Sequence, residues 1–254
     1  MTPQPHRLDR TVTIHASRET VFRFFTDSPR WASWWGAGST IDPAPGGQVL
    51  IRHPGGVEVT GKIVEIAPPQ RIVFTYGNAS GSPIPPGGST VTIELERQGT
   101  GTRLHLIHTF ADATQRDHFV QGWRYQLAVF GNIVSDEANA GAAARVDDWF
   151  RGWSEPDAAA RERLFAGLVS ADLQFRDRYS HLDGMADLLP HITAAQHFMP
   201  GVQLRRDGDV RHCQGTVLAD WTATADGQPR GRGTNVFVVG GDGKFTSITG
   251  FWAK

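Results

Sequence analysis

The feature that most constrains this chain is a break in its hydrophobic pattern near the middle. The segment Ser135–Ala144 reads SDEANAGAAA and contains no large apolar residue. Large apolar side chains recur at helical spacing on both sides of it, from Phe119 to Phe130 and from Val146 to Trp153. Two amphipathic helices separated by a segment that cannot contribute to a core predict a domain boundary near residue 140.

The expected domain limits follow from this break. A chain of 254 residues is long enough for two domains. We expect a first domain over residues 8–135, a linker over 136–144 and a second domain over 145–254. Because alanine favours helix, the linker can itself be helical.

The first half reads as a strand, a helix, several strands and one long helix. Ser17 is placed to cap a helix that Pro29 would end. Gly-Gly and Pro-Pro pairs then separate segments that predict strands, among them 61–66, 71–76, 90–97 and 102–110. The segment 77–89, GNASGSPIPPGGS, is rich in Gly and Pro and predicts a loop.

The second half places its helices mainly before its strands. Apolar periodicity predicts helices near 146–153, 157–169 and 185–197, and strands at 172–179, 202–210, 216–225, 233–239 and 245–252. Asp226-Gly227 and the glycine-rich segment 241–243 predict hairpin turns. Helices followed by an antiparallel sheet are typical of an α+β domain.

Composition excludes several classes of protein. The 25 basic and 26 acidic residues nearly cancel, which argues against a nucleic-acid partner bound through bulk charge. Cys213 is the single cysteine, so the chain has no internal disulfide and no cysteine-based zinc site. The absence of disulfides fits a cytoplasmic protein, which is the expected location. No cofactor is expected. No apolar run approaches the ~20 residues of a membrane-spanning helix, so no membrane partner is expected.

Motifs of the first half occur in an order that is typical of one superfamily. They are ASRETVF at 16–22, the tryptophan cluster at 31–35, GKIVEIAPP at 61–69, RIVFTY at 71–76, GTRL at 101–104 with His108, and Gly122-Trp123. Together they resemble the START-like (SRPBCC) superfamily, in the bacterial branch named after the activator of heat shock protein 90 ATPase. The resemblance implies a helix-grip fold, in which a curved antiparallel sheet wraps a long C-terminal helix around a cavity.

Motifs of the second half resemble the SnoaL-like (nuclear transport factor 2-like) family. They are FRD at 175–177, Gly184 at a helix start, Pro200-Gly201, Asp220-Trp221, GTNVF at 233–237, GKF at 243–245 and GFW at 250–252. The resemblance implies a cone-shaped α+β barrel, so the expected fold class is α+β, a helix-grip domain followed by a cone domain. The acidic residue that cyclase-like members carry near the last strand is absent from GFW.

Three clustered tryptophans are candidate ligand contacts of the first half. Trp31, Trp34 and Trp35 fall between the predicted first helix and the first long strand, in a segment rich in small residues. We expect this segment to be a loop, and the resemblance places it at a cavity entrance. The tryptophans either close that entrance or fill a gap in the core.

A histidine on the last predicted strand is the other candidate of this half. By alternation, His108 shares a face with Phe110 and with two leucines. Its imidazole either contacts a ligand or acts as a base, or else it is a core histidine bonded to Tyr76 or to a backbone carbonyl. The predicted ligand-binding residues of the first half are Trp31, Trp34, Trp35, Tyr76, His108, Phe110 and Trp123.

Asp177 is the candidate acid or base of the second half. On the predicted strand it alternates with Phe175 and Tyr179, and that face would point into the cone. A carboxyl group among aromatic rings would have a raised pKa, with Tyr179 as its catalytic helper. Alternatively, Asp177 ends the strand and hydrogen-bonds the following loop.

The remaining candidates of the second half are pocket-lining residues. Asn235 and Phe237 share a strand face, whereas Asp220 and Trp221 must point to opposite faces. His191 and His197 are six residues apart, a spacing that does not suit a metal pair on a helix, and no metal is expected. The predicted ligand-binding residues are Phe175, His197, Trp221, Asn235, Phe237 and Trp252.

These observations favour a bacterial two-domain protein that binds a small hydrophobic or aromatic molecule, with a cavity in each domain. One alternative is a cofactor-independent cyclase, isomerase or hydrolase that uses Asp177. Another is an interaction module that activates a chaperone ATPase, as the family name suggests. Cone domains often pair through the open face of their sheet, so the resemblance also predicts a homodimer.

Overall fold

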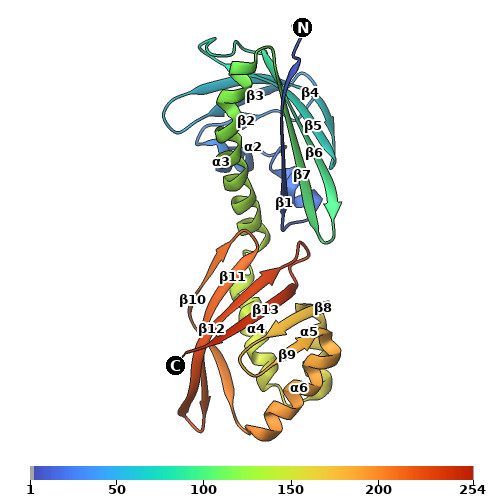
Figure 1. Ribbon diagram of the computed structural model, residues 1–254, viewed down its shortest axis with the longest axis vertical. Coiled ribbons are helices and arrows are strands. Elements are labelled where there is room, and N and C mark those ends of the chain that lie inside the picture. Colours follow the sequence, from blue (N-terminus) through green and yellow to red (C-terminus); the bar gives the residue numbers. More distant parts are fainter. Residues whose placement is uncertain (1–2, 254) are drawn as a thin grey trace. The chain divides into compact units, whose positions relative to one another are not determined.

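The computed structural model of the protein describes residues 3–253 (Figure 1). Its residue contacts divide the chain into two units, one ending at Ser135 and the other beginning at Asp136. Each unit combines helices with a large, mainly antiparallel sheet, so the chain is of the mixed α+β class. Lys254, the last residue of the predicted second domain, lies outside the described residues.

The first unit is built on a seven-stranded sheet in the order β1-β7-β6-β5-β4-β3-β2, with all neighbours antiparallel. Gly55 and Gly56 both have positive φ in the turn between β3 and β4, a conformation that glycine adopts without strain. The strands are β1 (His6–Ile14), β2 (Thr40–Ile41), β3 (Gln48–Arg52), β4 (Glu58–Ala67), β5 (Arg71–Asn78), β6 (Ser89–Gln98) and β7 (Gly101–Phe110).

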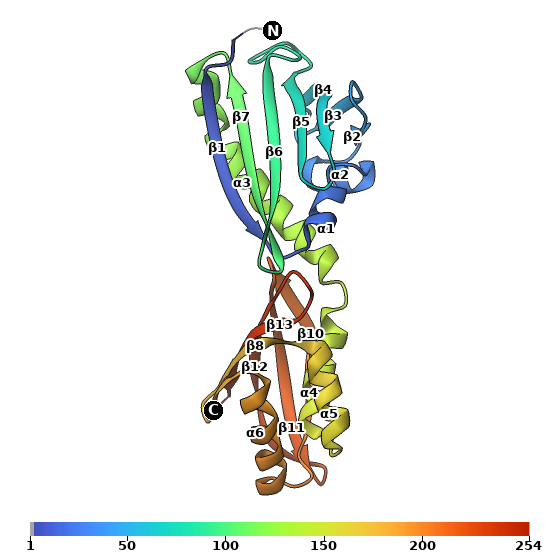
Figure 2. The same cartoon turned by 90° about the vertical axis from the view of Figure 1, so that its right-hand side faces the viewer.

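A long helix, α3 (Ala113–Ala138), lies along one face of this sheet (Figure 2). Every second residue of β7, including Leu104 and Leu106, is buried on that face, as strand alternation predicts. The buried stripe of α3 includes Trp123 and Leu127, four residues apart. The inward face of β7, which has a period of two, and the apolar stripe of α3, which has a helical period, therefore form one core.

The tryptophan cluster lies on a helix, so the predicted loop is wrong. Ser17 caps α1 (Arg18–Arg23) as expected, but that helix ends before Pro29. Pro29 instead lies in the first turn of a second helix, α2 (Ser28–Trp35). Proline is tolerated there because its missing N–H would have no partner within the helix. All three tryptophans are buried on α2.

The segment between the halves, where a linker over 136–144 was expected, is helical at both ends and partly buried. α3 continues to Ala138, and α4 begins at Ala142 after a short turn. Ser135, Asn139 and Ala142 are all buried.

The second unit has a six-stranded sheet in the order β10-β11-β12-β13-β8-β9, in which only β13 and β8 are parallel among the described strand pairs. The helices α4, α5 and α6 and the sheet share one apolar core. The sequence did not predict β9 or, in the first unit, β2, because each strand has too few residues to show an alternating pattern. The elements are α4 (Ala142–Ser154), α5 (Ala158–Leu168), β8 (Val169–Arg176), β9 (His181–Asp183), α6 (Gly184–Phe198), β10 (Gln203–Cys213), β11 (Thr216–Ala225), β12 (Gln228–Val239) and β13 (Phe245–Trp252).

Phe130 of α3 tests the packing of the first unit. Its fully buried ring lies 4.8 Å from the ring of Trp34 and 6.0 Å from that of Phe24, centroid to centroid. Phe130→Ala should lower the free energy of unfolding by about 3–5 kcal/mol, because it leaves a cavity among aromatic rings. Arg124→Ala, at an exposed position of α3, should change it by less than about 0.5 kcal/mol. Equal effects in urea unfolding would contradict this packing.

Candidate ligand-binding cavities

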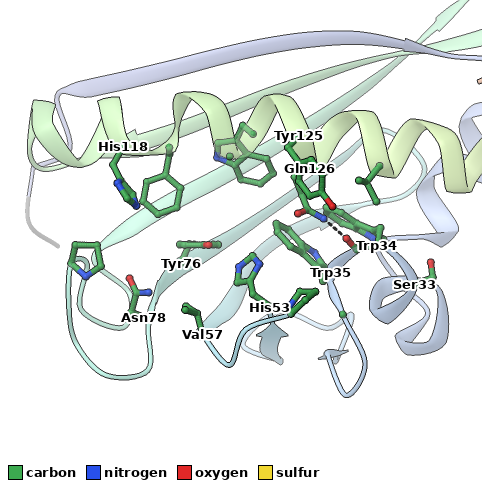
Figure 3. Close-up of a pocket in the computed structure, with 17 residues that line it drawn as sticks. Ser33, Trp34, Trp35, His53, Val57, Tyr76, Asn78, His118, Tyr125 and Gln126 are labelled. Atoms are coloured by element: carbon green, nitrogen blue, oxygen red, sulfur yellow. Dashed lines mark hydrogen bonds between the residues drawn. The ribbon is translucent and has the colours of Figure 1, made fainter.

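The first unit contains a cavity of about 550 Å³ between α2, α3, β5 and the turn that joins β3 to β4 (Figure 3). Ligand sites typically have volumes of about 300–1,000 Å³, so this cavity is large enough for a small organic molecule. Its lining residues are Ser33, Trp34, Trp35, Gly36, His53, Pro54, Val57, Tyr76, Asn78, Pro83, His118, Phe119, Gly122, Trp123, Tyr125, Gln126 and Val129.

Aromatic rings from α2 and α3 form one wall of this cavity. The ring of Trp35 lies 4.2 Å from that of Trp34 and 5.7 Å from that of Trp123, the latter pair nearly perpendicular. The side-chain amide of Gln126 donates a hydrogen bond to the carbonyl oxygen of Trp34, which joins α3 to α2. The wall is held by packing and by this bond, so its shape is preorganised.

A buried chain of hydrogen bonds lies behind that wall. Trp123 Nε1 donates to His108 Nδ1 at 2.9 Å, and because the indole N–H can only donate, the imidazole proton lies on Nε2. His108 Nε2 then donates to Ser89 Oγ at 2.8 Å, and Ser89 donates to the carbonyl oxygen of Tyr76 at 2.9 Å. Burial lowers the pKa of His108 to about 3, so the imidazole is neutral at physiological pH.

The polar end of the cavity carries no permanent charge. Burial lowers the pKa of His53 and raises the pKa of Tyr76, which keeps both groups neutral at physiological pH. In Figure 3, His53 lies between Tyr76 and Trp35, and Asn78 lies beyond Tyr76. No Asp, Glu, Lys or Arg is among the described residues that line the cavity. Such a cavity suits an uncharged molecule.

The cavity unites some of the predicted contacts of the first half and excludes others. Trp34, Trp35, Tyr76 and Trp123 line it, whereas Trp31, His108 and Phe110 do not. Those three side chains are fully buried behind the lining residues. His108 therefore corresponds to the core alternative, with Ser89 and Trp123 as its partners in place of Tyr76.

Three lining residues that the sequence reasoning missed follow patterns it could have used. His53 continues the inward alternation of Val49 and Ile51 just after β3. Asn78 lies two residues after Tyr76 on β5, and Gln126 lies three residues after Trp123 on α3.

A smaller cavity, of about 140 Å³, lies in the second unit. It contains two sheet tryptophans, Trp221 and Trp252, whose rings are 4.9 Å apart and nearly perpendicular. Glycine makes room for them, since a Cβ on Gly233 would lie 2.8 Å from Trp221 Cζ2. The lining residues are Trp149, Phe150, Trp153, Phe175, Asp177, Met199, Val202, Leu204, Trp221, Ala223, Arg230, Asn235, Gly250 and Trp252.

Asp177 lines this second cavity and also fixes the loop that follows it. Its Oδ2 accepts a hydrogen bond from Trp252 Nε1 at 3.2 Å, and its Oδ1 accepts one from the backbone N–H of Tyr179 at 2.8 Å. A second pair of the same kind joins Trp221 Nε1 to Asn235 Oδ1 at 2.9 Å. Each sheet tryptophan is thus oriented by one polar side chain of the cavity.

Three predicted residues of the second half lie away from the cavity. β8 ends at Arg176, so Tyr179 is not on the strand, and its side chain is 69% exposed. His197 is exposed near the end of α6, and Phe237 is fully buried in the core. The strand prediction extended too far because the loop residues happen to continue an alternating pattern.

The predicted residues that do line this cavity are Phe175, Asp177, Trp221, Asn235 and Trp252. Trp149 and Trp153 join them, although the helical stripe of α4 had indicated only core positions. Arg230 was also missed, because it lies at the β-bulge where the register of β11 and β12 shifts. Nothing local in the sequence indicated that bulge.

Two kinds of site are absent from the part of the chain that the structure describes. Over residues 3–253, no three His, Cys, Asp or Glu side chains are grouped so as to hold a metal ion. No helix in the same range has the length and apolar character needed to cross a membrane.

Comparison with known families concerns the first unit. Residues 15–135 match the family model described as Activator of Hsp90 ATPase homolog 1-like protein. This match confirms the predicted resemblance for those residues, which make up just under half of the chain. The SnoaL-like resemblance of the second half remains a prediction. No curated protein matches the chain.

Several solved structures match about half of the chain. A SnoaL-like family protein from Agrobacterium tumefaciens is 20% identical, with coverage of 44% of this chain and 96% of its own and a TM-score of 0.42. The AHSA1-like protein from Rhizobium etli is 29% identical, with coverage of 53% and 84% and a TM-score of 0.44. The Aha1 dimer from Colwellia psychrerythraea is 18% identical, with coverage of 48% and 90% and a TM-score of 0.43.

His108 makes the stability of the protein depend on pH. Its folded pKa of about 3 lies below the unfolded value of 6.5, so its contribution to stability is present above pH 6.5 and is lost as the pH falls toward 3. In that interval the loss is about 1.4 kcal/mol per pH unit. His108→Gln keeps one donor and one acceptor but does not titrate.

Urea unfolding of both chains at pH 7 and pH 5 tests this. The variant should lose less stability than the natural chain between the two values, because every other titrating group is common to both. An identical loss would show that His108 is not buried in its neutral form.

Proposed function

We propose that the first cavity binds a small, uncharged aromatic molecule. The observation that carries this proposal is a cavity of about 550 Å³ lined by indole and phenyl rings and by neutral polar groups, with no ionic side chain among its described lining residues. Aromatic walls favour flat ligands, and Tyr76, Asn78 and His53 offer hydrogen bonds at one end. A charged ligand would lose its hydration here without gaining an ion pair.

The same proposal assigns the two halves. We propose a START-like helix-grip domain over residues 8–135 and a SnoaL-like cone domain over 145–254, each with its own ligand cavity. The helix α3 on its sheet and the family match support the first assignment. The second cavity is small enough that its ligand must be compact. A cytoplasmic location and a homodimer through the second sheet remain predictions.

The enzymatic alternative has less support from the geometry. Both carboxylate oxygens of Asp177 already accept N–H groups, and its predicted helper Tyr179 is exposed outside the cavity. Hydrogen bonds donated to a carboxylate stabilise its charged form and make it a weaker base. We therefore place ligand binding ahead of cyclase, isomerase or hydrolase chemistry.

A cavity-filling variant tests the first proposal. Gly122 lines the cavity from α3, and a Cβ there would meet nothing within 4 Å, so Gly122→Phe should fill the space without a clash. We expect 2-naphthol, a flat uncharged probe, to raise the melting temperature of the natural chain and not that of Gly122→Phe. The variant should bind the probe at least about tenfold more weakly, a loss of ~1.4 kcal/mol.

Gln121→Phe supplies the matched control, because it adds the same ring at an exposed position of α3 outside the cavity. It should bind the probe like the natural chain. Undiminished binding by Gly122→Phe, or no binding of flat aromatic probes by the natural chain, would overturn the proposed use of the first cavity.

A second candidate function follows from the family match of residues 15–135, whose description names activation of the Hsp90 ATPase. If the full chain is such an activator, a bacterial Hsp90 should hydrolyse ATP faster with the full chain present than with an equal concentration of serum albumin. An unchanged hydrolysis rate over a range of concentrations would remove this candidate.

A further inference from the structure

The second cavity concentrates the tryptophans of its unit. Of the 8 tryptophans in the chain, all four that follow residue 135 line this cavity of about 140 Å³. Trp149 and Trp153 come from α4 with rings inclined at 70°, and Trp221 and Trp252 come from the sheet with rings inclined at 84°. Rings that meet nearly at right angles present π faces from several directions, which is the geometry of an aromatic cage for a cation.

The charged groups of this cavity are one acid and one base. Asp177 is half-buried and is held against the cage by Trp252 Nε1, whereas Arg230 is exposed and therefore lies at the mouth. Within the described residues, the cation–π contacts are those of Arg30 with Phe24 and Arg178 with Tyr179, so no side chain of the protein places a cation on the cage rings. The cage therefore has a negative side and a positive mouth, and no cation of residues 3–253 lies on its rings.

The hydrogen-bond acceptors that line the cavity limit which type of ammonium ion can bind there. The side-chain acceptors in the cavity are few, because its described lining residues offer only the oxygens of Asp177 and Asn235, and each of these oxygens already accepts one N–H group. An ammonium ion with its own N–H groups would have to share these oxygens with the indole and backbone donors, which is costly in an apolar site. A methylated ammonium has no such groups and needs only ring faces and a nearby negative charge.

The side-chain amide of Asn235 is a further polar group in the wall of this cavity. Asn235 is 5% exposed, and its Oδ1 accepts the Trp221 N–H, so its amide Nδ2 is the atom of this side chain that can donate to a ligand. A donor in the wall of a largely apolar cavity favours a ligand that carries an acceptor. A carboxylate would supply that acceptor and would also be attracted to Arg230 at the mouth.

We propose that the second cavity recognises a compact zwitterion in which an N-methylated ammonium group lies beside a carboxylate. The ammonium group is held by the tryptophan faces and Asp177, and the carboxylate by Asn235 and Arg230. This inference rests on the proposed use of the second cavity as a binding site. It adds the charge and shape of the ligand.

Calorimetric titration of the full chain with two isosteres tests the inference. Trimethylglycine has the proposed groups, whereas 3,3-dimethylbutanoate has the same shape and carboxylate but a neutral carbon in place of nitrogen. We expect trimethylglycine to bind at least about tenfold more tightly. Equal affinities would overturn the recognition of a cation and leave the cavity as a binding site. No binding of either compound would overturn both.

Two variants test which side chain pairs with each charge of the ligand. Asp177→Asn keeps an acceptor for the Tyr179 N–H and should weaken trimethylglycine binding about tenfold. Asp172→Asn, on β8 and outside the cavity, should leave it unchanged. Arg230→Gln should weaken trimethylglycine binding but not that of tetramethylammonium, which has no carboxylate. Circular dichroism melting confirms that each variant is folded. Unchanged binding by Asp177→Asn would overturn the inference.

Discussion

In the first unit, the indole N–H of Trp123 donates to His108, His108 donates to Ser89, and Ser89 donates to the carbonyl oxygen of Tyr76. This buried chain joins α3 to strands β5, β6 and β7, and it determines where the rings of Trp123 and Tyr76 lie on the cavity surface. Each donor in it has one acceptor, so the arrangement is satisfied only when the imidazole is neutral. The aromatic wall depends on that protonation state.

The two cavities differ in the charge of the polar groups that lie beside their aromatic rings. In the first, the polar groups at the surface are neutral, and burial keeps them neutral. In the second, Asp177 and Asn235 orient the tryptophans through the indole N–H groups, and one formal charge remains at the cage. The first arrangement favours a flat uncharged molecule, and the second favours a compact charged one.

Much of the fold followed from local patterns. The buried faces of β7 and α3 were predictable because a strand alternates with a period of two and a helix with a period near four. Pro29 misled the prediction because proline both ends helices and begins them. For the site, alternation also contained the signal for His53 and Asn78, but Arg230 was not predictable because a bulge changes which face a residue takes.

Within regular helices and strands, away from bulges and strand ends, the sequence by itself determined which side chains point inward, because that depends only on the repeat of the local backbone. It also determined the neutrality of the first cavity's surroundings, since no ionic residue falls at the inward positions that line it. Only the tertiary structure decided which inward residues line a cavity and which lie behind its walls. Trp31 and Trp35 share one short helix, yet Trp35 reaches the cavity and Trp31 is enclosed by its neighbours. The physical reason is that empty space depends on side chains from distant segments, and no local pattern contains their positions.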